Sequence, residues 1–160
     1  MSTIELGLDT FGDVTVDAEG RPLSQARVLR DVVGEAELAD RVGVDFIGLG
    51  EHHRPDFAIS APEVVLAAIA GRTERIRLGT AVTVLSSDDP VRVYERFATL
   101  DAVSGGRAEV ILGRGSFTES FPLFGYSLDD YEILFEEKLA IFAALRDADR
   151  TGEPAHWKGT

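Results

Sequence analysis

Two hydrophobic patterns alternate along this chain, and the alternation repeats four times. Runs rich in apolar and β-branched residues at 4–11, 44–49, 76–85 and 108–112 predict short strands. After each run, apolar residues recur every three or four positions, which is the spacing of an amphipathic helix. The second half of the run at 76–85 is almost uninterruptedly apolar, as expected of a strand buried on both faces. The predicted order is strand then helix, four times.

The predicted helices carry recognisable start and stop signals. Ser24 is placed to cap the first helix, and Gly43 is a natural end for it. Pro62 and Pro90 fit the first turns of the second and third helices, where a missing N–H does no harm. The apolar stripe of the fourth helix comprises Tyr131, Leu134, Phe135, Leu139, Phe142 and Leu145.

The connections between the predicted strands indicate a parallel sheet. No two strands are separated by a two-residue hairpin signal, so each crossover contains a helix, and such crossovers are right-handed. This α/β pattern fits either a complete doubly wound sheet or the first half of an eight-stranded (β/α)8 barrel, which needs roughly 250 residues. We find no linker, and we expect residues 1–160 to form a single domain.

Charge and cysteine content narrow the functional classes. The formal net charge of -12 disfavours partners with phosphate backbones or anionic lipid surfaces, so we expect neither nucleic-acid nor membrane binding. The absence of cysteine excludes disulfides and cysteine nucleophiles, and it fits a reducing cytoplasm. The first residues lack the basic start and apolar run of a signal peptide, and no apolar run approaches membrane-spanning length.

The most reactive side chains follow the second predicted strand directly. Glu51, His52 and His53 come at its carboxyl end, the edge at which α/β enzymes place catalytic groups. Consecutive side chains of an extended segment point to opposite sides, so a shared metal ion is a weak interpretation. An imidazole that titrates near neutral pH suits general acid–base work or hydrogen bonding to an anion. The alternative is a histidine that only caps a helix or bonds a carbonyl group.

Two further strand ends could contribute to a site. Gly79 to Thr83, within the third strand, are small enough to make room for a flat ligand or merely to pack the core. Gly113, Arg114 and Gly115 follow the fourth strand, where Arg114 could pair with an anionic group. This segment matches neither a P-loop nor a dinucleotide fingerprint, so a tight turn is the alternative. The phenylalanines that follow predict a hydrophobic cluster under a loop or the wall of a pocket: Phe117, Phe121 and Phe124.

Four motifs in order give the chain a family resemblance. They are Gly-Val-Asp-Phe-Ile-Gly-Leu-Gly-Glu-His-His, then Arg-Ile-Arg-Leu-Gly-Thr-Ala-Val, then Asp-Pro-Val-Arg, and then Leu-Asp-Ala-Val-Ser-Gly-Gly-Arg-Ala-Glu-Val-Ile-Leu-Gly-Arg-Gly. Each motif is ordinary alone, but the ordered set resembles the bacterial luciferase-like flavin-dependent monooxygenases. The resemblance extends from the first strand to about Leu145.

The resemblance implies an α/β fold of the (β/α)8 TIM-barrel type, with only the first four β/α units present as a half barrel. It implies a site for reduced FMN, or for the deazaflavin F420, at the carboxyl ends of the strands. His52 would lie near the flavin ring. Ala81 and Val82 would back that ring, often through a non-proline cis peptide bond. Gly113, a cysteine in some members, and Arg114 would flank the flavin, with the arginine directed toward its phosphate chain.

These implications predict an oxidoreductase in which reduced FMN and O2 oxygenate a small organic substrate. We expect His52 to be the acid–base or hydrogen-bonding group and Glu51 to orient it, with no metal involved. A flavin reductase is the expected partner. The alternatives are F420-dependent hydride transfer, a catalytically silent assembly module, and a zinc hydrolase that uses His52 and His53. Family members are about twice as long, so we expect either part of a longer chain or a half barrel that pairs with a second copy.

Overall fold

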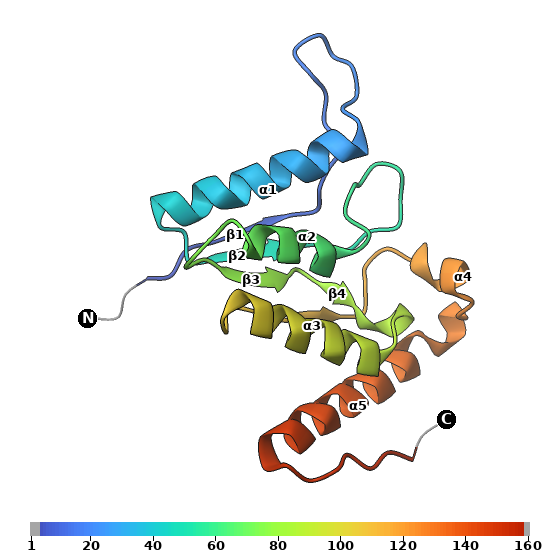
Figure 1. Ribbon diagram of the computed structural model, residues 1–160. Coiled ribbons are helices and arrows are strands. Elements are labelled where there is room, and N and C mark those ends of the chain that lie inside the picture. Colours follow the sequence, from blue (N-terminus) through green and yellow to red (C-terminus); the bar gives the residue numbers. More distant parts are fainter. Residues whose placement is uncertain (1–3, 159–160) are drawn as a thin grey trace.

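The computed structural model describes residues 4–158 (Figure 1). Its strands are β1 (Gly7–Thr10), β2 (Phe46–Leu49), β3 (Arg77–Thr80), β4 (Thr83–Val84) and β5 (Leu112–Gly113). Its helices are α1 (Gln25–Val42), α2 (Pro62–Ala70), α3 (Pro90–Ser104), α4 (Ser120–Phe124) and α5 (Tyr131–Thr151), with short 3-10 turns η1 (Leu85–Ser87) and η2 (Leu128–Asp130). None of the helices within residues 4–158 is both long and apolar enough to cross a membrane.

The strands are parallel, as the crossover pattern predicts. β1, β2 and β3 form one sheet in that order, and β4 pairs with β5 in a second. A parallel bridge between Leu78 and Ala108 brings the chain that leads into β5 alongside β3. All four strand regions therefore end at the same edge, toward the right of Figure 1, where the loops that follow them gather.

Helices cover one face of the sheet, and the main core lies between the two layers (Figure 1). Ile47, Leu49 and Leu78 from the strands are buried in one cluster with residues of α1, α2 and α3. The helix boundaries follow the predicted signals. The Ser24 side chain accepts a hydrogen bond from the Arg27 N–H at the start of α1, and Gly43 ends that helix with φ 89°. α5 packs against α3 at the far side from α1.

The third predicted strand is wrong in its length. It ends at Thr80, and β4 begins at Thr83, with a cis peptide bond between Ala81 and Val82. Ala81 N–H still donates to Leu49 O, whereas Thr83 N–H donates to Ile111 O, so the pairing partner changes across the break. The apolar pattern could not show this because both halves are buried. The first strand is shorter than predicted, and the fourth forms a ladder only at Leu112–Gly113.

The face of the sheet opposite the helices carries one large ring over glycines. Side chains alternate along a strand, so Phe46 and Gly48 point away from Ile47 and the helices. A Cβ added at Gly79 would lie 2.6 Å from the Phe46 ring, and one at Gly48 would lie 3.1 Å from it. Phe46 thus lies flat against β2 and β3, and glycine is required beneath it.

Candidate functional site

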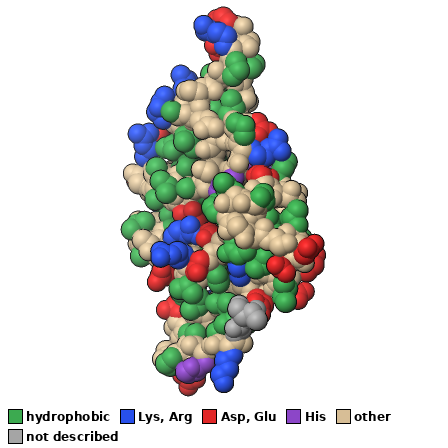
Figure 2. All heavy atoms as spheres, turned by 90° about the vertical axis from the view of Figure 1, so that its right-hand side faces the viewer, with side chains coloured by type: hydrophobic (Ala, Val, Ile, Leu, Met, Phe, Trp, Pro, Cys, Tyr) green, Lys and Arg blue, Asp and Glu red, His purple; other side chains and the backbone are tan. Residues whose placement is uncertain are grey.

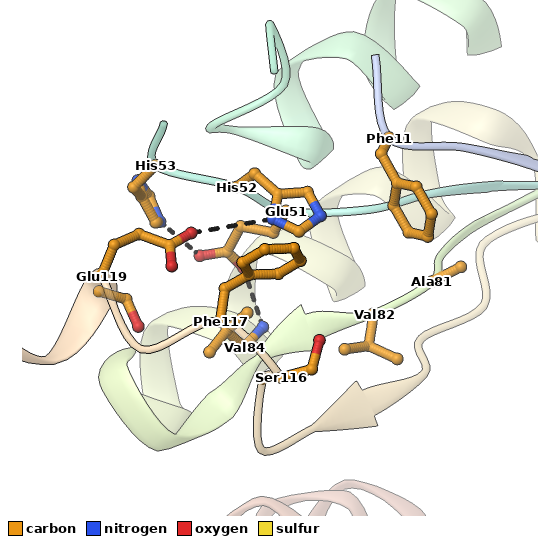
Figure 3. Close-up of a pocket in the computed structure, with 12 residues that line it drawn as sticks. Phe11, Glu51, His52, His53, Ala81, Val82, Val84, Ser116, Phe117 and Glu119 are labelled. Atoms are coloured by element: carbon orange, nitrogen blue, oxygen red, sulfur yellow. Dashed lines mark hydrogen bonds and ion pairs between the residues drawn. The ribbon is translucent and has the colours of Figure 1, made fainter. Parts of the chain in front are cut away.

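The carboxyl ends of the strands enclose a cavity of about 70 Å³ (Figure 3). Its wall takes Phe11 from the end of β1, Glu51, His52 and His53 from the end of β2, and Ala81 and Val82 from the break after β3. The segment that joins β5 to α4 forms the remaining wall. Figure 2 looks onto this end of the molecule: a small area of histidine shows near the centre, and another lies at the bottom of the view. The histidine that sequence pattern singled out thus lies in a pocket.

An aromatic box holds His52. Its side chain is buried, and its backbone N–H donates to Ile59 O at 2.9 Å. The Phe57 ring stacks on the imidazole, with 4.2 Å between centroids and 22° between planes. Phe11 and Phe117 meet it edge-on at 5.3 and 4.9 Å. Packing on several sides leaves the imidazole little rotational freedom.

Two polar atoms of the cavity lining are buried without a hydrogen-bond partner. One is Nδ1 of His52, whose closest carboxylate oxygen is Oε1 of Glu119 at 3.8 Å. The other is Oγ of Ser120, a residue that is only 2% exposed. Buried polar atoms are nearly always paired, so orphaned ones in one cavity indicate a ligand or water that would satisfy them.

The hydrogen bonds of Glu51 go to Val84 and His53, whereas the sequence-based expectation gave this residue the task of orienting His52. One of its carboxylate oxygens accepts a hydrogen bond from Val84 N–H at 2.9 Å. The other lies 2.9 Å from Nε2 of His53 (Figure 3). The two histidines alternate in direction because they are neighbours on an extended segment, so the preceding carboxylate reaches the second rather than the first. The acid beside His52 is Glu119.

The end of the third strand carries the cis peptide bond that the resemblance implies, and it lies at the same cavity as His52. Ala81 and Val82 line the cavity, and the peptide bond between them is cis. Gly113 lies directly against Val82, because a Cβ on Gly113 would come within 2.4 Å of Val82 Cγ2. Gly113 therefore permits the close approach of β5 to this wall.

Arg114 points away from the cavity in this structure. Its guanidinium pairs with Glu132 at 2.9 Å and lies over the Phe135 ring, 5.3 Å from the centroid. Neither Gly113 nor Arg114 is among the residues that line the cavity. The structure brings His52, Ala81 and Val82 together and leaves Arg114 on the α5 side.

The predicted phenylalanine cluster is divided between three places. Phe117 lies against His52 with the Arg54 guanidinium over its ring at 5.1 Å. Phe121 is fully buried, and Phe124 meets His53 edge-on at 4.9 Å. The pattern of aromatic residues alone could not separate a pocket wall from a core contact.

Sequence reasoning missed four residues of this site: Phe11, Phe57, Glu119 and Ser120. Glu119 and Ser120 follow the fourth strand end closely, and this position was the available signal for them. Phe11 had a similar signal, because it follows the first strand directly. Phe57 had none, since it lies in the irregular loop after His53.

A second cavity of about 190 Å³ lies beyond Glu51 and His53. Glu63 lines it, and burial raises the pKa of this carboxyl, while the nearby Arg96 guanidinium opposes the rise. Arg96 lies 3.4 Å from Glu63 and also pairs with Asp88. Within residues 4–158, no group of three or more histidine or acidic side chains is arranged to hold a metal ion.

Known proteins match this chain over most of its length. The family pattern of luciferase-like monooxygenases covers residues 10–160. The alkanal monooxygenase alpha chain of Photorhabdus luminescens is 31% identical over 127 residues, which are 79% of this chain and 35% of that protein. The 4-hydroxyprotoasukamycin monooxygenase of Streptomyces nodosus subsp. asukaensis is 36% identical over 115 residues, 71% of this chain and 31% of that protein. The chain spans about one third of the length of these relatives.

Solved structures share the fold. The monooxygenase RslO1 of Streptomyces bottropensis superposes with a TM-score of 0.74 at 28% identity, over 86% of this chain and 41% of that one. The oxygenating constituent of 3,6-diketocamphane monooxygenase of Pseudomonas putida, in complex with FMN, superposes with a TM-score of 0.78 at 22% identity. The match covers 90% of this chain and 40% of that one. An F420-dependent secondary alcohol dehydrogenase superposes with a TM-score of 0.74 at 20% identity, over 97% of this chain and 44% of that one.

The last two likenesses show the fold alone, because their sequence identities are low. The family pattern and the more similar relatives go further, because they match more than two thirds of the chain. The chain belongs to the luciferase-like monooxygenase family.

Proposed function

We propose that this chain forms the flavin-binding edge of a monooxygenase that uses reduced FMN and O2 to oxygenate a small organic substrate. One observation carries the proposal: a buried imidazole with an unpaired nitrogen shares a cavity with the flat Ala81–Val82 peptide. A planar heteroaromatic ring with donors and acceptors on its edge matches that combination of a flat wall and unsatisfied polar atoms. The two relatives described above, at 31% and 36% identity, are monooxygenases by name.

The polar groups of the cavity match the hydrogen-bonding groups of such a ring, although the cavity is narrow. Ser120 Oγ and His52 Nδ1 are both without partners, and a flavin edge could satisfy such groups. Small-molecule sites usually span roughly 300–1,000 Å³. A cavity of about 70 Å³ therefore admits a flavin only after the segment carrying Phe117 moves outward.

His52 is the proposed acid–base or hydrogen-bonding residue. A bound reduced flavin would supply the electrons that activate O2. With Nδ1 directed toward Glu119, Nε2 is the ring atom left to accept a proton or a hydrogen bond in the cavity. Phe57 and Phe117 exclude water from the imidazole, which strengthens its interaction with any charge that develops nearby.

We further propose that residues 1–160 act as one domain that supplies the first four β/α units of a barrel. A flavin reductase is the proposed partner that delivers reduced flavin. In this arrangement Arg114 would leave Glu132 and turn toward the flavin phosphate, since an exposed ion pair of this kind is weak. Gly113 would stay glycine because Val82 fills the space of a side chain.

F420-dependent hydride transfer is the second candidate, favoured by the fold shared with an F420-dependent alcohol dehydrogenase. Oxygen consumption during turnover separates the two reactions, because only the monooxygenase uses O2. A catalytically silent module remains the third candidate. It predicts no flavin binding at all.

Titration of the purified chain with FMN, followed by flavin fluorescence, tests the proposal. Saturable binding in the micromolar range supports it, and a linear response up to millimolar FMN supports the silent module. Substitution of Phe57 by alanine opens the box around His52 and should weaken binding. A matched change on the helix layer, Leu38→Ala, should leave it unchanged.

In the active enzyme, His52→Ala is expected to lower turnover about 10²–10⁴-fold, the usual contribution of a general acid or base. His156→Ala is the matched control, because His156 is exposed and outside the cavity. Stopped-flow measurement of flavin oxidation in the presence of substrate checks the result. Equal rates for wild type and His52→Ala would remove His52 from the reaction.

A further inference from the structure

Glu119 begins α4 without capping it. The residue stands at the position before that short helix, from which shorter polar side chains often accept a backbone N–H. Its side chain makes no such bond. Instead the carboxylate is directed toward the imidazole of His52, as Figure 3 shows, with Oε1 3.8 Å from Nδ1. The side chain therefore does not cap the helix and faces the cavity.

The other charged groups near His52 already have partners. Arg54 and Asp56 form an ion pair through two hydrogen bonds, each 2.9 Å long. Glu51 is bonded to Val84 N–H and to His53. Glu119 is thus the carboxylate available to the unpaired Nδ1, and Nδ1 is buried away from water.

The gap between Glu119 Oε1 and His52 Nδ1 is short. A charge-assisted N–H···O bond measures about 2.7–2.9 Å, so Glu119 must approach by roughly 1 Å. Rotation about the side-chain bonds of Glu119 can supply that movement, whereas the buried Ser120 and Phe121 hold the backbone that follows it. The imidazole is fixed by Phe57, so the carboxylate is the group that moves.

We propose that Glu119 is the positioning residue of His52: it accepts a hydrogen bond from Nδ1–H and so keeps Nε2 unprotonated and facing the cavity. The hydrogen bond made by one ring nitrogen decides which tautomer a histidine adopts. This inference rests on the proposed function only where it gives Nε2 a task in the reaction. Glu51, by contrast, is hydrogen-bonded to His53 rather than to His52.

The test is the tautomer of His52 in the purified chain, read from ¹⁵N resonances of the imidazole nitrogens above the pH at which the ring loses its charge. The chain has three histidines, so His52→Gln assigns the signal by its disappearance. We expect Nδ1–H in the wild type and a shift toward Nε2–H in Glu119→Ala. Glu119→Asp keeps a carboxylate and should restore part of the Nδ1–H population.

Two further variants keep the result interpretable. Glu119→Met preserves side-chain length without an acceptor, so it should shift the tautomer even where Glu119→Ala disturbs the loop. Glu136→Ala removes an exposed acid from α5 and should leave His52 unchanged. A wild-type Nδ1–H population that persists in folded Glu119→Met overturns the proposal. The measurement needs no flavin, so its failure is distinct from a failure of FMN to bind.

Discussion

At the scale of single residues, Asp40 shows how one buried carboxylate joins two elements. It lies near the end of α1 and accepts hydrogen bonds from the backbone N–H groups that lead into β3: Glu74 at 3.2 Å, Arg75 at 3.0 Å and Ile76 at 2.7 Å. These bonds place the start of β3 beside α1. The position of the third strand end in the site therefore depends on an acid outside the site.

The pKa of Asp40 is lowered from 3.8. Burial alone would raise the pKa, but the backbone N–H groups of Ile76, Glu74 and Arg75 favour the ionised form and prevail. A carboxyl whose pKa is lower in the folded state stabilises the fold above its unfolded pKa. This contribution is lost as pH falls through the folded pKa, which lies below 3.8.

Asp40→Asn is therefore expected to lower the free energy of unfolding by about 1–3 kcal/mol at pH 7, because a buried hydrogen-bonded carboxylate is replaced by an amide. The difference from wild type should shrink as pH falls from 3.8 toward the lower pKa of the folded protein, because the unfolded chain binds the proton first. Urea unfolding at several pH values measures both quantities.

Asp31→Asn is the control for Asp40. Asp31 pairs with Arg27 on the exposed side of α1, so its loss should cost less than about 0.5 kcal/mol. A difference for Asp40→Asn that is the same at pH 7 and pH 3 would contradict the pKa argument.

At the scale of elements, the segment between β5 and α4 decides how open the cavity is. Phe117 closes it through an edge contact with His52 and a cation–π contact with Arg54. Each such contact is worth roughly 0.5–1.5 kcal/mol. Opening the cavity for a ligand means breaking them.

Phe117→Ala is expected to tighten FMN binding about 5–100-fold, since the two contacts that must break are already absent and roughly 1–3 kcal/mol is recovered. Flavin fluorescence titration measures the affinity. Phe124→Ala, outside the first cavity, is the control and should leave it unchanged. Weaker binding by Phe117→Ala would show that Phe117 stacks on the ligand rather than closing the cavity.

At the scale of the whole molecule, the sheet is only partly covered. Within residues 4–158, β1 pairs with β2 alone, so one of its edges is free. Leu6 and Leu8 along this strand are 63% and 52% exposed, and Ile111 beside β3 is 45% exposed. Free parallel edges with apolar side chains favour association with another chain.

The chain alone is therefore expected to self-associate, with a mass by light scattering above 17.3 kDa that rises with concentration. Added salt should strengthen the association, because it screens the repulsion that a net charge of -12 creates. Ile111→Asp should reduce it, whereas Leu38→Asp on the outer face of α1 should not. A constant monomer mass up to high concentration would contradict this expectation.

Local signals in the sequence determined the elements and their order. Caps, prolines and helical spacing act within a few residues, so Ser24, Gly43, Pro62 and Pro90 marked boundaries that the structure confirms. Parallel strands followed from the crossover lengths. The placement of Glu51, His52 and His53 at a strand end followed as well, because the apolar run stops there.

The tertiary structure alone decided the pairing of these side chains. Glu51 bonds to His53, Glu119 faces His52, and the third strand divides at Ala81 and Val82. Each outcome depends on side-chain direction or on contacts between segments far apart in the chain, and a hydrophobic pattern records neither. A hydrophobic pattern in a sequence reports only which residues are buried. These arrangements differ in geometry while the same residues stay buried, so the pattern cannot distinguish them.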